Sequence, residues 1–193
     1  MSESESGSGS ESESASDSRS PSTFTEAEEF RLTMLPSLVG SAVAFSSKSG
    51  VIGTAKEMMA NAKSASAGTE DYPDNSIIRM VLPAFEDRSE AMDRAKAIRD
   101  KQLEQLDEAG ISTREQMKTH ALSEAAAVNE LLAAKASATE AAQYRQWVMG
   151  VANAVATAAK EGGFLGFGGE EVSEGEVETL AEISSALGLE GGM

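Results

Sequence analysis

The side chains that could do chemistry in this chain are few, and most of them lie near the C-terminus. The sequence holds one histidine, His120, and no cysteine. Glutamates crowd residues 170–178, and carboxylate oxygens are the ligands that a hard cation such as Ca²⁺ prefers. Glu170, Glu171 and Glu174 are therefore candidate metal ligands. The same glutamates suit the first turn of a helix, whose dipole favours negative charge, and this structural interpretation stays open beside the first.

No constellation of nucleophile, base and orienting group accompanies these residues. A di-iron bundle needs Glu-x-x-His on two helices, a serine hydrolase needs a Gly-x-Ser-x-Gly turn, and neither motif occurs. His120 follows Met117 by three residues and lies at the edge of an apolar helix stripe, so we expect a half-packed boundary residue. The sequence thus predicts a protein that is not an enzyme and carries no cofactor.

A glycine-rich segment at residues 162–169 resembles a phosphate-binding loop only superficially. It contains no lysine, follows a predicted helix instead of a strand, and runs into two glutamates that would repel phosphate. Two interpretations remain: a helix cap followed by a connection whose apolar side chains plug into the core, or an exposed aromatic docking loop. In either case the candidate interaction residues are Phe164, Leu165 and Phe167.

Net charge restricts the partners. The 193 residues include 40% apolar residues and carry a net charge of −16, with a pI near 4.4. Nucleic-acid binding needs clustered lysine and arginine, and an anionic membrane surface would repel this chain, so we expect neither partner. The longest apolar-rich stretch, at residues 34–45, is too short to span a bilayer, and we expect a cytoplasmic protein.

Residues 1–22 are a low-complexity Ser/Glu/Gly tract with a net charge of −4. Such a tract has too little apolar surface to offset the entropy of ordering, which predicts a disordered tail in front of one domain at residues 23–193. Serines beside acids would also suit phosphorylation. The tract resembles the leaders of proteins from salt-loving archaea, which would make the acidic surface an adaptation to salt, and an ordinary acidic protein is the alternative.

Helical periodicity dominates the domain and predicts an all-α bundle of six to seven helices. We expect helices at residues 25–46, 51–66, 75–82, 87–109, 112–135, 138–161 and 173–187. Capping boxes are predicted at Thr25–Glu28, Ser112–Glu115, Ser137–Glu140 and Ser173–Glu176. Glycine C-caps are predicted at Gly68, Gly110, Gly162 and Gly188.

The helix faces indicate how the bundle packs. The helix at 25–46 is apolar over more than half of its circumference, so it is either central or covered by a partner, and Pro36 predicts a kink or break in it. Short connections predict that consecutive long helices are antiparallel neighbours. In the helix at 87–109 the expected core stripe is Met92, Ala95, Ile98, Leu103, Leu106 and Ala109. In the next two helices it is Met117, Ala121, Val128, Leu131 and Leu132, then Tyr144, Trp147, Val148, Val151, Val155 and Ala158.

The glycine-rich stretch and the helix beginning at Ser173 resemble the ends of a group of small helical prokaryotic proteins without assigned activity. That resemblance implies a helical fold and brings no catalytic residues. From the residues themselves we predict a non-enzymatic interaction or stress-associated protein that binds a protein partner or a second copy of itself. The alternative is a helical domain that binds a small ligand or a divalent cation through its acidic C-terminal loop.

Overall fold

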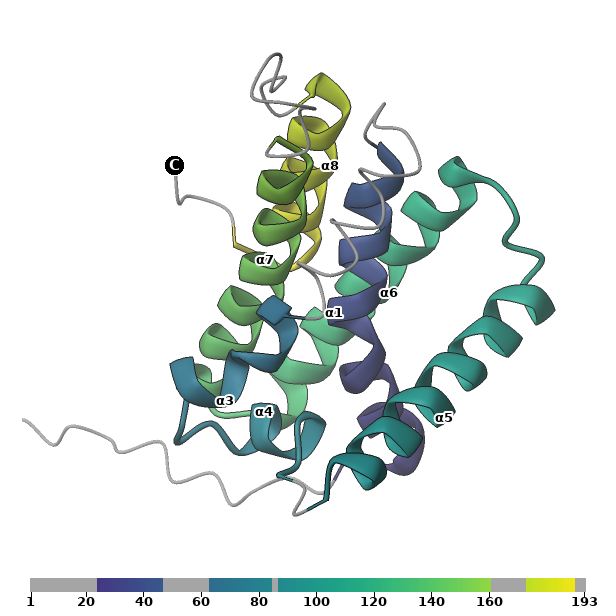
Figure 1. The fold of residues 1–193 in the computed structure, drawn as a ribbon. Coiled ribbons are helices and arrows are strands. Elements are labelled where there is room, and N and C mark those ends of the chain that lie inside the picture. Colours follow the sequence, from purple (N-terminus) through teal and green to yellow (C-terminus); the bar gives the residue numbers. More distant parts are fainter. Residues whose placement is uncertain (1–23, 47–62, 85–86, 161–172, 190–193) are drawn as a thin grey trace, which may run out of the picture.

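The computed structural model describes residues 24–46, 63–84, 87–160 and 173–189, and these ranges form α-helices and no strand (Figure 1). The predicted all-α bundle is therefore confirmed. The helices are α1 (Glu26–Ser46), α3 (Gly68–Asp71), α4 (Ser76–Val81), α5 (Arg88–Glu108), α6 (Arg114–Lys135), α7 (Ala138–Lys160) and α8 (Glu174–Ala186). Residues 63–66 are also helical, whereas the tail at 1–22 and the rest of the helix predicted at 51–66 lie outside the described residues.

Helix α1 is the centre of the bundle. It packs against α4, α6, α7 and α8, and Figure 1 shows these helices arranged around it. Leu35, Val39 and Val43 are almost completely buried, together with apolar side chains of every neighbour. The wide apolar face that the sequence shows is thus explained by this central position, because the core surrounds the helix on several sides.

Of the kink or break expected at Pro36, the break does not occur, and α1 runs through this residue as one helix. Proline has no N–H, so the carbonyl oxygen of Leu32, four residues earlier, lacks its helical donor. The hydroxyl of Tyr144 on α7 donates a hydrogen bond to that oxygen at 2.6 Å. Complete burial raises the pKa of the Tyr144 phenol, which keeps it protonated as a donor. A side chain from another helix therefore supplies the hydrogen bond that proline removes.

Capping follows the sequence at three of the four predicted helix starts. The hydroxyls of Thr25, Ser137 and Ser173 accept backbone N–H bonds three residues on. The box predicted at Ser112–Glu115 is wrong: Thr113 is the N-cap and Gln116 closes the box. The Gln116 amide oxygen accepts from the backbone N–H groups of both Ser112 and Thr113, each at 3.0 Å. Because the Gln116 amide satisfies both of these donors, the N-cap lies one residue later than the predicted Ser112.

Two predicted glycine caps are confirmed and one is wrong. Gly110 and Gly188 end their helices at φ of +66° and +68°, a conformation that favours glycine. Gly68 instead begins α3 and lies against the indole of Trp147, where an added Cβ would clash. The Trp147 N–H donates to the Ala65 carbonyl at 3.1 Å, which fixes the indole over this glycine. Gly162 lies outside the described residues.

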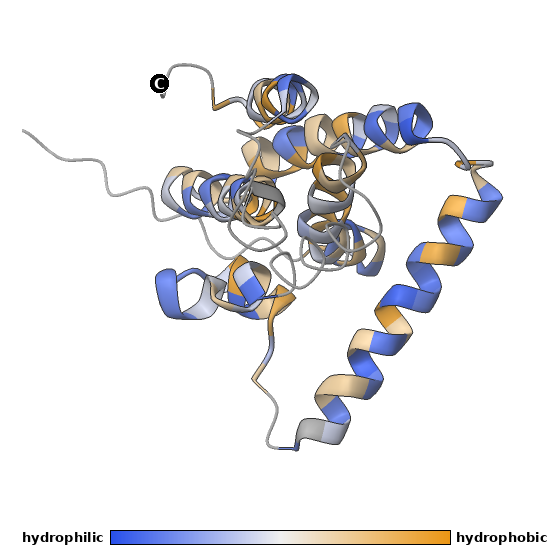
Figure 2. Ribbon diagram, turned by 45° about the horizontal axis from the view of Figure 1, so that its top comes forward, coloured by the Kyte–Doolittle hydropathy of each residue, from blue (hydrophilic) through white to orange (hydrophobic). Residues whose placement is uncertain are grey.

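Helix α5 does not join the bundle as the sequence suggested. Figure 2 shows it apart from the other helices, joined to them through its two ends. Its expected core stripe is not buried: Met92 is 64% exposed and Leu103 is 57% exposed. By contrast, most of the predicted stripes of α6 and α7 lines the core, although Ala158 does not belong to it and Met117 is only partly buried. The prediction that consecutive long helices are packed neighbours is therefore wrong for α5.

The Tyr144 hydroxyl should stabilise the protein only because Pro36 leaves a carbonyl unpaired. We expect Tyr144→Phe to lower the free energy of unfolding by about 1–3 kcal/mol, the cost of a buried unsatisfied acceptor. In a Pro36→Ala background the helical N–H returns, so the same substitution should cost clearly less. The measurement is a double-mutant cycle by chemical denaturation. Tyr72→Phe, at the chain's other tyrosine, is the control, and equal costs in the two backgrounds would refute this role of Tyr144.

Candidate binding surface

Most residues predicted to bind a ligand or partner lie outside the described ranges. Phe164, Leu165, Phe167, Glu170 and Glu171 belong to residues 161–172, so the structure tests neither interpretation of the glycine-rich segment. Glu174 is described and is exposed in the first turn of α8. Within the described ranges, no three His, Cys, Asp or Glu side chains are grouped so that they could hold a metal ion.

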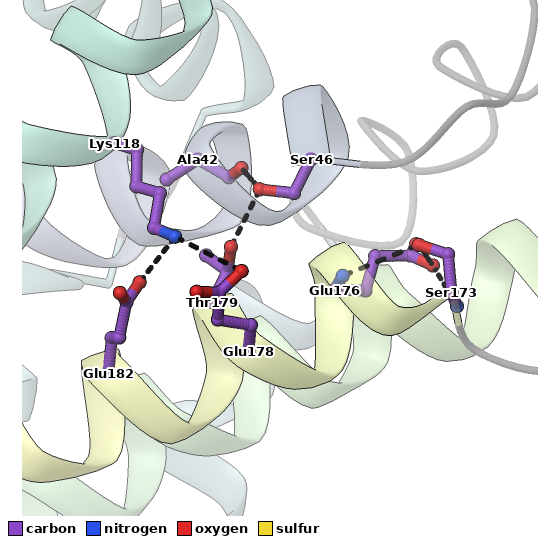
Figure 3. Close-up of polar contacts among 8 residues, drawn as sticks. All are labelled: Ala42, Ser46, Lys118, Ser173, Glu176, Glu178, Thr179 and Glu182. Carbon is purple, nitrogen blue, oxygen red and sulfur yellow. Dashed lines mark hydrogen bonds and ion pairs between the residues drawn. The ribbon is translucent and has the colours of Figure 1, made fainter.

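The other glutamates of α8 take part in structural contacts (Figure 3). Glu176 is buried and closes the capping box with Ser173. Glu182 lies 2.6 Å from the Lys118 ammonium on α6, and Glu178 lies 3.9 Å from it. The hydrogen bond to Glu182 raises the pKa of Lys118. The Glu182 contact ties α8 to α6, whereas Glu174 and the more distant Glu178 are exposed.

The same region shows why α8 lies close to the C-terminal end of α1. Ser46 donates its hydroxyl hydrogen to the Ala42 carbonyl at 2.8 Å, so the Thr179 hydroxyl must donate to Ser46 at 2.8 Å (Figure 3). Gly175 fits against the Ser46 carbonyl, which would lie 3.0 Å from an added Cβ. The N-terminal turn of α8 is thus fixed on its inner side, and its outer side is a rigid surface.

Near His120 the structure forms a cleft of about 340 Å³ between α1, α5 and α6. His120 is half-buried, as expected for a boundary residue. Apolar side chains of α1 line the cleft, among them Phe30, Met34 and Leu38. At its edge Arg31 pairs with Glu124, with the guanidinium Nε 2.8 Å from a carboxylate oxygen. The sequence placed His120 correctly but did not show this cleft, because the cleft exists only where α5 stands away from the bundle.

Two side-chain contacts hold the middle and the end of α5 near the bundle. The Lys101 ammonium lies 4.1 Å from the centroid of the Phe30 ring, a cation–π contact. Leu106 packs against a small apolar cluster that contains Leu38 and Ala121. No side chain described for residues 89–108 is buried. Ala91, Ala95 and Gln102 lie on the same face as this stripe, and such short or polar side chains give the bundle little apolar area to cover.

The acidic and basic residues of α5 lie on different faces of the helix. At 100° per residue, all acids of the helix fall within an arc of about 100°: Glu90, Asp93, Asp100, Glu104, Asp107 and Glu108. Among the described bases, Arg94 and Lys101 lie along one edge of the apolar stripe and Lys96 lies along the other, whereas Arg99 lies within the stripe and pairs with Asp100 at 2.8 Å. A stripe bordered by cations is unusual in a chain with twice as many acids as bases. This surface would attract an acidic partner.

No protein-family model, curated protein or solved structure matches this chain. None of the described helices is long and apolar enough to cross a membrane.

Proposed function

We propose that the protein is a non-enzymatic, cytoplasmic interaction protein that self-associates, with the cation-bordered stripe of α5 contacting the acidic outer side of α8 in a second copy. The observation that supports this most is the exposure of α5. A 21-residue helix with no buried side chain among residues 89–108 receives little stability from the rest of the described chain. Because isolated helices are marginally stable in water, most need an apolar contact surface. A second molecule would provide that surface.

Helix α8 has the properties that this contact requires. Within the described ranges, three large apolar side chains are more than half exposed: Met92 and Leu103 on α5, and Val177 on α8 at 54%. Val177 lies between the exposed carboxylates of Glu174 and Glu178, and α8 contains no lysine or arginine. Apolar residues bordered by cations would thus face an apolar residue bordered by anions. The two surfaces differ, so the contact is head-to-tail and would build rings or longer assemblies.

Overall repulsion between two chains of charge −16 opposes this association, and salt decides which effect wins. At about 0.15 M salt the Debye length is roughly 8 Å, which screens charges spread over the molecule. Pairs in direct contact are screened much less. We therefore expect association at physiological or higher salt, and dispersal in dilute buffer.

Charge reversal tests the contact directly. Lys96→Glu/Arg99→Glu should abolish association, because carboxylates of α5 would then oppose those of α8. Glu174→Lys/Glu178→Lys should abolish it as well, and an equimolar mixture of the two variants should associate again. The readout is the mass from light scattering across a concentration series at physiological salt, with circular dichroism to confirm folding.

The matched control is Lys63→Glu/Arg114→Glu, which changes the net charge equally at exposed positions outside both surfaces. This variant should associate like the original protein. A monomeric original protein at the highest soluble concentration would refute the proposal, and so would an unchanged mass of the α5 variant.

We also propose that the acidic surface is adapted to salt. With a net charge of −16, like-charge repulsion should lower stability in dilute buffer. Raising salt from 0.1 to 1 M shortens the Debye length from roughly 10 Å to about 3 Å, so the melting temperature should rise over that range. Differential scanning calorimetry in NaCl measures it at low protein concentration, where association does not contribute. A flat or falling curve would contradict the adaptation.

A further inference from the structure

A second cleft, of about 520 Å³, lies between α4 and the N-terminal half of α5. Most of its lining is apolar and includes Val81, Leu82, Pro83, Ala95 and Ile98. Its volume falls within the range of pockets that bind small ligands, roughly 300–1,000 Å³. The apolar lining favours a hydrocarbon body, because burying that body removes apolar surface from water.

The charged residues that the structure describes in this cleft are both arginines, Arg79 from α4 and Arg94 from α5, and no carboxylate of the described ranges lines it. Neither guanidinium has a hydrogen-bond or ion-pair partner in the part of the chain that the structure describes. Acids outnumber bases two to one in this protein. Two other described bases, Lys118 and Lys135, are partly buried between helices and pair with glutamates. A guanidinium presents paired donors that match a carboxylate.

The wall that carries Arg79 is held rigidly. The Asn75 side chain caps α4 by accepting from the Ile78 N–H at 3.0 Å. The same amide donates to the Glu140 carbonyl and to the Gln143 side chain on α7, each at 3.0 Å. Helix α4 is therefore locked to the core, whereas the opposite wall belongs to α5, which has few contacts of its own. A ligand that bridges the two arginines would join α5 to the bundle.

We infer that this cleft binds a free monocarboxylate with an unbranched apolar chain, with Arg79 and Arg94 holding the carboxylate and the apolar lining holding the chain. The inference rests on this cleft and not on self-association, and a bound chain would compete with a second copy at the shared residues Arg94, Ala95 and Ile98. The charge of the cleft selects an anion, and its apolar lining selects a hydrocarbon chain over a compact anion such as phosphate. The rest of the surface is acidic and would attract cations, whereas this cleft would attract an anion.

Isothermal titration calorimetry with octanoate tests this inference on the full chain. We expect one site per chain, at least tenfold weaker binding of the isosteric neutral octanamide, and no binding of acetate or inorganic phosphate. Shortening the acid from octanoate to hexanoate should weaken binding by about fourfold per methylene, the usual contribution of a buried CH₂. Equal affinity for octanoate and octanamide would overturn the inference, as would a stoichiometry well above one.

Variants connect the binding to this cleft. Arg79→Gln and Arg94→Gln should each weaken octanoate binding at least tenfold without changing octanamide binding, whereas Arg114→Gln, on the exposed first turn of α6, should leave both unchanged. Lys96→Glu/Arg99→Glu should still bind octanoate, which separates this inference from self-association. Unchanged affinity in both arginine variants would refute it. Stronger binding to anionic lipid vesicles than to free octanoate would show that a membrane surface is the ligand, and would refute it too.

Discussion

The hydrogen bond from Tyr144 to the Leu32 carbonyl is the contact on which the bundle depends. Helix α1 lies against α4, α6, α7 and α8, so a break in it would separate the packing partners of all four. Pro36 removes the N–H that this carbonyl needs, at a buried position where water cannot replace it. Tyr144 restores this hydrogen bond. Its ring also makes an edge-on contact with the Trp147 ring, with 5.4 Å between the ring centroids, and Trp147 packs on Gly68. One phenol thus links the central helix to α7 and to the start of α3.

Local signals in the sequence predicted the helices well, and the errors arise where distant residues act. Periodicity and caps placed α1, α6, α7 and α8 nearly to the residue, because a cap such as Ser173–Glu176 is complete within one turn. Pro36 predicted a kink or break, and no break occurs because the compensating donor, Tyr144, lies on another helix, 112 positions from the Leu32 carbonyl. The stripe of α5 predicted core packing because a helical wheel shows where apolar residues lie, not whether a partner covers them. The two clefts beside α5 could not be predicted from the sequence for the same reason, because they depend on how α5 lies relative to the other helices.

Bases in this acidic chain have two kinds of position. Lys118 and Lys135 serve the fold by pairing with glutamates between helices, and the Lys135 hydrogen bond lowers the pKa of Glu28 to about 2. Those of the second kind border α5 or line the clefts beside it, and their local positive charge contrasts with the rest of the surface. The main core draws on the other helices, and α5 adds only Leu106, which packs against a smaller cluster. We therefore propose that α5 contributes a contact surface for a partner.

Hydrogen–deuterium exchange, followed peptide by peptide at two protein concentrations, tests most directly whether α5 depends on a partner for its stability. In a dilute sample, backbone amides of residues 89–108 should exchange far faster than those of α1 and α7, because local opening of α5 breaks few apolar contacts. Their protection should rise with protein concentration at physiological salt, while that of α7 stays constant. If the amides of α5 are as protected as those of α7 in the dilute monomer, the helix is a stable part of the isolated fold and needs no partner.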